Sequence, residues 1–169
     1  MSILCPDYIF KSVDRISPQF LHERGIRALV LDVDNTLTAH DSQELAPGVA
    51  DWIERMRDAG IALRISSNNT AARVRPFAEK LGLPFVSFSL KPAPRGLWIA
   101  RRALGVEKRE MALVGDQVFT DMLAAKFYGI TVLMVQPVAP DFKWNIRFKR
   151  VLERPILARY YKKGGKLYE

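Results

Sequence analysis

Two carboxylates separated by a single residue follow directly after an apolar run, because Ala28–Leu31 leads into Asp32, Val33 and Asp34. Carboxylates this close together at the end of a buried strand repel each other unless a cation lies between them or one is protonated. Magnesium would supply that cation, since it prefers carboxylates, a carbonyl oxygen, water and the oxygens of a substrate phosphate. Alone, the pair also fits an acidic turn after a strand. Together with the polar residues that follow the other apolar runs, it predicts a phosphate-cleaving site.

Five more polar residues, Ser67, Asn68, Lys91, Asp116 and Asp121, stand at or just beyond the ends of other apolar runs. In a parallel sheet, residues at the carboxyl ends of the strands converge in space although they are far apart in sequence. A lysine and a hydroxyl group would stabilise charge on phosphate oxygens, and Asp116 would add a carboxylate for the metal. Asp121 has two interpretations, since a negative charge in the first turn of a helix is favourable without any metal.

The elements that must position these residues alternate along the chain. We expect the apolar runs to be strands, at residues 27–32, 61–65, 85–88, 111–114 and 131–135. We expect helices between them: one begins after Ser17, one lies between Pro47 and Gly60, and others lie at about 75–81, 94–104 and 120–128. This alternation predicts an α/β fold of three layers with a five-stranded parallel sheet.

The composition fits a single domain of 169 residues that needs no disulfide, because Cys5 is the only cysteine. The first residues do not resemble a secretory signal, since Pro6 and Asp7 come early and no basic segment precedes them. Asp32 and Gln136 interrupt the two best apolar stretches, so neither approaches the roughly 18 residues of a spanning helix. We therefore expect a cytoplasmic protein.

Four motifs in order resemble those of the haloacid dehalogenase (HAD) superfamily of aspartate-nucleophile phosphatases: Asp-Val-Asp-Asn-Thr at 32–36, Ser-Ser-Asn at 66–68, Lys-Pro at 91–92, and Gly-Asp at 115–116 with Asp121. The residues of these motifs are most similar to those of the YqeG-type members of subfamily III-A, and the resemblance runs from about residue 29 to residue 135. It implies a Rossmann-like HAD fold, a Mg²⁺ cofactor and hydrolysis of a phosphomonoester through an aspartyl phosphate. Asn35 stands where the superfamily commonly has glycine.

The resemblance also implies a role for each of the predicted polar residues. Asp32 would be the nucleophile, and Asp34 would be the general acid in the first step and the general base in the second. The implied phosphate ligands are Ser67 and Lys91, and we also predict that Asn68 binds phosphate. The implied metal ligands are Asp32, Asp116 and the backbone carbonyl of Asp34, and Asp121 would support the metal through these ligands.

The spacing of the motifs leaves little room for an inserted cap domain. About ten residues, 38–47, separate the first motif from the next helix, and about 25 separate the second motif from the third. The site should be essentially capless and open, which suits a bulky phosphate ester better than a small metabolite. YqeG-type proteins resemble the mitochondrial phosphatidylglycerophosphate phosphatases. This similarity implies conversion of phosphatidylglycerophosphate to phosphatidylglycerol, with the protein peripheral on the inner face of the membrane.

Positive charge is concentrated at the end of the chain. From Lys143 onward nine basic residues accompany two acidic ones, so this segment carries +7 of the formal net charge of +8. We expect residues 1–140 to form the HAD core and 141–169 to form a basic, aromatic-rich tail. The tail should be helical from residue 141 or 142 to about 161 and frayed around 164–165. Its composition is typical of a segment in a membrane interface, and it also fits a helix that packs on its own domain.

Two alternatives to a lipid phosphatase stay open. A basic tail would also follow a nucleic-acid backbone, which fits a nucleic-acid end phosphatase of the same subfamily. The other alternative is a non-catalytic protein that uses the HAD domain as a scaffold on RNA or ribosomes. The crowded carboxylates of Asp32 and Asp34 argue against it, because a scaffold has no need of them. Nothing in the sequence sets an oligomeric state.

Overall fold

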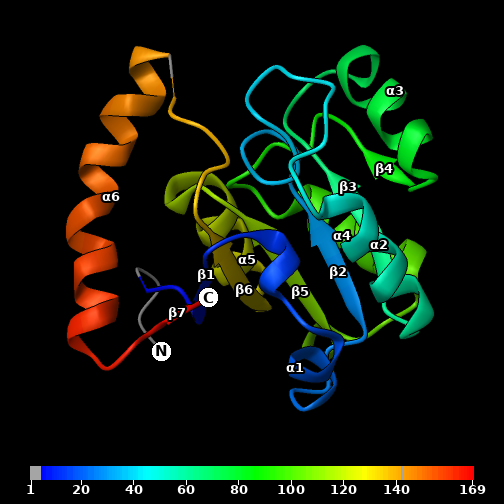
Figure 1. Cartoon of the computed structure of the whole chain (residues 1–169), viewed down its shortest axis with the longest axis horizontal. Coiled ribbons are helices and arrows are strands. Elements are labelled where there is room, and N and C mark those ends of the chain that lie inside the picture. The colour runs from blue at the N-terminus through cyan, green and yellow to red at the C-terminus, as the bar shows by residue number, and fades with distance from the viewer. Residues whose placement is uncertain (1–4, 142) are drawn as a thin grey trace.

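A parallel β-sheet forms the centre of the protein, with helices on both faces (Figure 1). The structure is a computed structural model that describes residues 5–141 and 143–169. The strands lie in the order β4-β3-β2-β5-β6-β1-β7, and every neighbouring pair is parallel. Their bounds are β1 Tyr8–Phe10, β2 Ala28–Leu31, β3 Ala62–Ser66, β4 Phe85–Val86, β5 Met111–Gly115, β6 Thr131–Val135 and β7 Leu167–Tyr168. The predicted three-layer α/β class is confirmed.

The helices connect the strands and cover the sheet. Their bounds are α1 Pro18–His22, α2 Val49–Asp58, α3 Ala71–Leu81, α4 Arg95–Leu104, α5 Leu123–Tyr128 and α6 Trp144–Lys162, with 3-10 turns at Val13–Arg15 and Lys108–Glu110 and a π-helical turn at Val118–Met122. The short helix α1 begins as predicted, because Ser17 caps it by accepting a hydrogen bond from the backbone N–H of Phe20.

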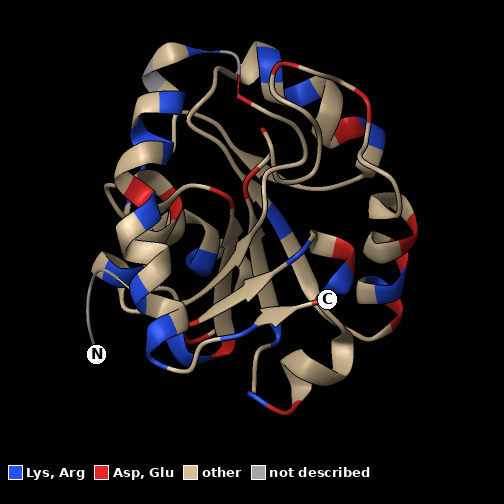
Figure 2. Cartoon of the chain, turned by 60° about the vertical axis from the view of Figure 1, so that its left-hand side comes forward, with Lys and Arg blue, Asp and Glu red and all other residues tan. Residues whose placement is uncertain are grey.

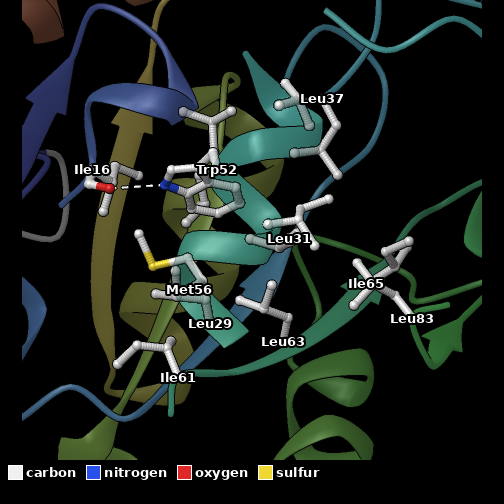
Figure 3. Packing of buried hydrophobic residues seen from close by; sticks show 14 of the residues in the cluster. Ile16, Leu29, Leu31, Leu37, Trp52, Met56, Ile61, Leu63, Ile65 and Leu83 are labelled. Atoms are coloured by element: carbon white, nitrogen blue, oxygen red, sulfur yellow. Dashed lines mark hydrogen bonds between the residues drawn. The ribbon is translucent and has the colours of Figure 1, made fainter. Parts of the chain in front are cut away.

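Two hydrophobic cores lie on opposite faces of the sheet, and strand β2 contributes to both. Leu29 and Leu31 pack with side chains of α1, α2 and α3, whereas Ala28 and Val30 pack with side chains of α4 and α5. Trp52 of α2 fills the centre of the first core, and its indole N–H donates to the carbonyl oxygen of Ile16 at 2.8 Å (Figure 3). A strand buried on both faces is held in one register, so its carboxyl end has a fixed position.

The strand register brings the predicted polar segments to one edge of the sheet. Leu31 at the end of β2 pairs with Ile65 of β3 on one side and with Val114 of β5 on the other. The residues that follow these three strands therefore leave the sheet side by side. Asp32 continues this arrangement, since its backbone N–H donates to the carbonyl oxygen of Val114 at 2.9 Å.

Among the described residues the sheet has seven strands rather than the expected five. Strands β1 and β7 extend the sheet beyond β6, with Ile9 opposite Leu167. The expected fraying around 164–165 is also wrong, because Tyr168 stacks on the ring of Phe10 with centroids 4.9 Å apart. Strands of three and two residues are too short to show a periodicity, so packing against the rest of the sheet decides their structure.

Two helices begin at positions that differ from the prediction. Helix α3 starts at Ala71 rather than 75, since Thr70 caps it by accepting a hydrogen bond from the N–H of Arg73. The segment expected to be helical from 120 instead opens with the π-helical turn at Val118–Met122. Such turns often occur at functional sites, and this one contains Asp121.

The basic tail forms helix α6, which begins beside the carboxyl edge of the sheet and runs along one side of the molecule (Figure 1). Ile146, Glu153 and Tyr160 are buried, whereas Trp144 and Phe148 are exposed. Figure 2 shows lysine and arginine residues spread along this helix. The expected start at Asp141 is wrong, and Phe142 lies outside the described residues. Among the described helices, none is long and apolar enough to cross a membrane.

Candidate active site

The Lys91 ammonium group lies at the centre of the predicted site. Its Nζ donates to Asp32 Oδ1 at 2.5 Å, to Asp121 Oδ1 at 2.6 Å and to the carbonyl oxygen of Ser66 at 3.1 Å. All of these groups are buried. Three segments that are far apart in the sequence thus meet around one buried cation, as the convergence of parallel strand ends requires.

A cluster of three carboxylates surrounds this lysine. Asp32, Asp116 and Asp121 each offer one oxygen, and these oxygens all lie within 4.8 Å of one another. Asp116 is only 2% exposed, and its Oδ1 atom is buried without a hydrogen-bond partner. An unpaired buried carboxylate oxygen is costly unless a cation binds it. The donor set, made only of oxygens, fits a hard divalent ion such as Mg²⁺.

The electrostatics of the cluster also favour a cation. Burial raises the pKa of Asp32 to about 7, although the neighbouring Lys91 ammonium lowers it. Burial likewise raises the pKa of Asp116 well above its usual range, against the opposing effect of Arg150. Burial alone would lower the pKa of Lys91, but Asp121 and Asp32 more than offset this effect, and the pKa lies above its usual value. Lys91 and Arg150 therefore do not fully offset the cost of burying these carboxylates in their ionised form.

The Asp34 carboxylate is held apart from this cluster by three donors. Its Oδ1 accepts from the N–H of Asp41 at 3.1 Å and from Arg73 Nη2 at 3.0 Å, and its Oδ2 accepts from Asn69 Nδ2 at 2.6 Å. Asn35 beside it adopts a left-handed conformation with φ of 58°. Asparagine tolerates this conformation better than most residues, which explains how it stands where a glycine is common.

Ser67 and Asn68 lie in the loop after β3. The Ser67 hydroxyl oxygen accepts a hydrogen bond from the N–H of Asn69 at 3.1 Å, so its own proton stays available to a ligand. Asn68 is engaged at both polar atoms: its Oδ1 accepts from the N–H of Lys91 and from Ser89 Oγ, each at 2.8 Å, and its Nδ2 donates to the Lys91 carbonyl at 2.9 Å. These bonds fix the backbone that carries Lys91.

Asp121 is positioned by a close approach that only glycine allows. Its Oδ2 accepts from the N–H of Gln117 at 3.1 Å, which folds the turn back toward the end of β5. A Cβ atom added to Gly115 would lie 2.4 Å from Asp121 Cγ, far inside van der Waals contact. The Gly-Asp sequence at 115–116 therefore serves two purposes, since the glycine makes room for one carboxylate and the next residue supplies another.

Four residues of the site were not predicted. Asn69 and Arg73 hold Asp34, and two residues of α6 reach the loop after β5: Arg150 donates to Asp116, and Glu153 Oε1 accepts from the N–H of Val118 at 2.8 Å. Asn69 could have been predicted as a site residue, because it lies only two residues after Ser67 in the sequence. Arg150 and Glu153 offered none, because on the sequence they are two charges among many in a basic segment.

Comparison with known proteins places this geometry in a family. A family model described as haloacid dehalogenase-like hydrolase matches residues 15–129. The chain is 36% identical to "Probable phosphatase YqeG" of Bacillus subtilis over 94% of this chain and 92% of that protein. It is 25% identical to "Phosphatidylglycerophosphate phosphatase 1, chloroplastic/mitochondrial" of Arabidopsis thaliana, over 95% of this chain and 49% of the plant protein.

Solved structures share the fold. The 4-nitrophenylphosphatase of Thermotoga maritima superposes with a TM-score of 0.58 at 15% sequence identity, over 70% of this chain and 89% of that chain. Because the family model spans more than half of the chain and the bacterial relative matches nearly all of it, this protein belongs to the haloacid dehalogenase-like hydrolases.

Proposed function

We propose that this hydrolase is a magnesium-dependent phosphomonoesterase that works through an aspartyl phosphate on Asp32. The observation that carries the proposal is the buried cluster of Asp32, Asp116 and Asp121 around Lys91, with one oxygen of Asp116 unpaired. Phosphate monoesters hydrolyse extremely slowly without a catalyst, so the site must place an anionic nucleophile in line with phosphorus and stabilise the charge on the phosphate oxygens.

In the first step, one Asp32 oxygen attacks phosphorus, and the bond from phosphorus to the ester oxygen breaks. Lys91 is placed to stabilise the oxygens of the transferring group, because its Nζ lies 2.5 Å from Asp32 Oδ1. The Ser67 hydroxyl group donates to the same phosphate. Asn68 acts indirectly, by holding the Lys91 backbone through its two amide atoms. The departing alkoxide takes a proton from Asp34.

In the second step, Asp34 removes a proton from water, which attacks phosphorus, releases inorganic phosphate and restores the Asp32 carboxylate. The hydrogen bonds from Arg73, Asn69 and the Asp41 N–H fix the position of the Asp34 carboxyl group, which this base role requires. For the acid role in the first step, Asp34 must enter protonated, with its proton directed to the ester oxygen of the substrate in place of one of these donors.

The residues that would hold magnesium are Asp32, Asp116 and the backbone carbonyl of Asp34. Asp121 lies close enough to take part directly, since its carboxylate belongs to the same cluster. A bound Mg²⁺ would supply positive charge that neutralises the phosphate oxygens and the crowded carboxylates together.

The proposed substrate is phosphatidylglycerophosphate, and the proposed product is phosphatidylglycerol. Its support is the similarity to the plant phosphatase of that name and the open site. Between β2 and α2 the described chain forms only a loop, which folds back through bridges between Asp34 and Thr38 and between Thr38 and Leu45. A site without a covering domain can reach a phosphate that protrudes from a membrane.

The exposed face of α6 supports action at a membrane surface. Residues 1–140 would form the catalytic core, and the exposed face of the tail at 141–169 would contact the anionic headgroups, with the enzyme peripheral on the membrane. Exposed apolar side chains stand on α6 beside exposed basic ones, as in helices that lie in the membrane interface. The exposed apolar residues are Trp144, Phe148, Val151, Leu152 and Tyr161, and the exposed basic ones include Arg147, Arg159 and Lys162.

The test is phosphate release from a panel of esters, with magnesium and with chelator. The panel holds phosphatidylglycerophosphate in mixed vesicles, a 5′-phosphorylated oligonucleotide, a phosphopeptide and glycerol phosphate. We expect magnesium-dependent turnover that is fastest on the lipid, and no turnover by Asp32→Asn or Asp34→Asn.

Preferred hydrolysis of the oligonucleotide, with binding to it but not to anionic vesicles, would replace the lipid by a nucleic-acid end. High efficiency on glycerol phosphate would contradict the argument from the open site. Near-normal turnover by Asp32→Asn would overturn the mechanism, and no turnover of any ester by the folded wild type would favour a scaffold.

A further inference from the structure

We infer that Arg150 of α6 is a positioning residue for the metal site, an assignment that rests on the proposed function. Arg150 binds both the side chain and the backbone of Asp116. Arg150 Nη2 donates to Asp116 Oδ2, and Arg150 Nη1 donates to the Asp116 backbone carbonyl at 2.5 Å. A planar guanidinium that binds the side chain and the main chain of one residue fixes both the position and the rotation of that carboxylate.

The guanidinium is itself held by two further carboxylates. Arg150 Nε donates to Asp141 Oδ2 at 2.8 Å, and Nη1 donates to Glu153 Oε2 at 3.1 Å. Asp141 also accepts from Asn35 Nδ2 through its other oxygen at 2.7 Å. Arg150 therefore joins the loop that carries Asp34 to the loop that carries Asp116.

Glu153 holds the same loop from one helical turn further along α6. Its carboxylate is 1% exposed, and its Oε1 accepts the backbone N–H of Val118 at 2.8 Å. Val118 begins the π-helical turn that contains Asp121. Two side chains of α6 thus restrain the short segment between the two carboxylates that follow β5.

These contacts give the two oxygens of Asp116 different tasks. Oδ2 is occupied by Arg150, whereas Oδ1 is buried, unpaired and left for a cation. Without Arg150 the carboxylate is free to rotate, and three buried acids, Asp116, Asp141 and Glu153, lose their shared partner. Residues that orient a metal ligand in this way typically change metal affinity by about 10- to 100-fold.

The direction of the change in Mg²⁺ affinity shows whether Arg150 acts by orienting Asp116 or only through its charge. Removal of a cation near the site would by itself strengthen the attraction of Mg²⁺ to the carboxylates. A weaker magnesium affinity after loss of Arg150 therefore reports lost orientation. Arg150→Lys adds a second discrimination, since it keeps the charge but cannot bind Asp116 at two atoms and Asp141 at the same time.

The experiment measures Mg²⁺ binding to the metal-free full chain by titration calorimetry for wild type, Arg150→Gln, Arg150→Lys and the control Arg154→Gln. Arg154 lies one turn further along α6, is exposed and carries the same charge. We expect Arg150→Gln to bind Mg²⁺ at least about tenfold more weakly than wild type. Arg150→Lys should also be weaker, and Arg154→Gln should be unchanged.

Kinetics provide a second readout. With a soluble aryl phosphate, the magnesium concentration for half-maximal rate should rise in Arg150→Gln, and kcat should recover at saturating magnesium. A purely structural loss would lower kcat at every magnesium concentration. Circular dichroism confirms that each variant is folded. If Arg150→Gln does not fold, Glu153→Gln keeps an oxygen for the Val118 N–H and removes only the charge that holds Arg150, and it should weaken affinity by a smaller factor.

Equal or tighter Mg²⁺ binding by folded Arg150→Gln would overturn this inference and leave the proposed function in place. A wild-type chain that binds no Mg²⁺ would overturn the proposed function itself.

Discussion

Replacement of the nucleophile should make the metal-free protein more stable while it abolishes turnover. Asp32→Asn keeps the size of the side chain and removes a charge that is buried with two other carboxylates. Lys91 keeps Asp121 as its partner at 2.6 Å, so the substitution leaves no cation unpaired. Active sites often hold such strained charge, and their loss of function then accompanies a gain in stability.

The size of the gain follows from the pKa of Asp32, which burial raises from 3.8 to about 7. Each unit corresponds to about 1.4 kcal/mol, so ionisation of Asp32 destabilises the folded state by an amount on the order of 4 kcal/mol. A raised carboxyl pKa means that stability is greatest below the unfolded value and is lost as the pH rises toward the folded value. Asp32→Asn does not undergo this loss.

The assay is urea unfolding of wild type and Asp32→Asn in chelator at several pH values. We expect the two proteins to be equally stable near pH 4, and Asp32→Asn to be more stable by about 2 to 4 kcal/mol at pH 8. Magnesium should then stabilise wild type more than the variant. A variant that is less stable than wild type at pH 8 in chelator would refute the argument that ionised Asp32 is costly in this buried cluster.

Three other predictions follow from the same contacts. Lys91→Met should abolish turnover and lower the free energy of unfolding by about 3 to 5 kcal/mol at pH 8. The loss should be smaller at pH 5, where Asp32 is protonated, and urea unfolding that shows the same loss at both pH values would contradict this prediction. Magnesium affinity should rise with pH up to about 7, since Mg²⁺ must displace a proton from Asp32 below that pH; calorimetry in two buffers should detect proton release, and a flat profile contradicts it. The substitutions Trp144→Ser and Phe148→Ser should weaken binding to anionic vesicles in a flotation assay. The control Phe127→Ser on α5, at a residue about as exposed as Phe148, should not weaken it, and equal effects of all three would contradict a membrane contact through α6.

The sequence predicted the fold class because its signals are local. Apolar runs such as 28–31 and 111–114 need burial on both faces, and the helix between Pro47 and Gly60 shows its buried side directly in the spacing of Val49, Trp52 and Met56. Strands β1 and β7, which extend the sheet beyond β6, gave no such signal. Their formation depends on a contact between the two ends of the chain, in which Phe10 meets Tyr168.

The residues of the site likewise divide into those that the sequence predicted and those that it did not. Asp32, Lys91 and Asp116 each follow a strand, so topology alone predicts that they meet. Arg150 lies 34 residues from Asp116 and reaches it only because α6 packs beside the π-helical turn. The sequence allowed α6 to pack on its own domain, but it did not indicate that Arg150 would reach the site, since composition does not distinguish a solvated arginine from one that binds a buried carboxylate.

The most direct test of the account is chemical identification of the residue that accepts the phosphoryl group. Wild type and Asp34→Asn are mixed with a phosphate-labelled aryl ester and magnesium, quenched in acid within one turnover, and digested for peptide mapping by mass spectrometry. We expect label on Asp32 in both proteins, with more of it in Asp34→Asn, and no label in Asp32→Asn. Turnover by wild type without label on Asp32 at any quench time, or label on another residue, would contradict it.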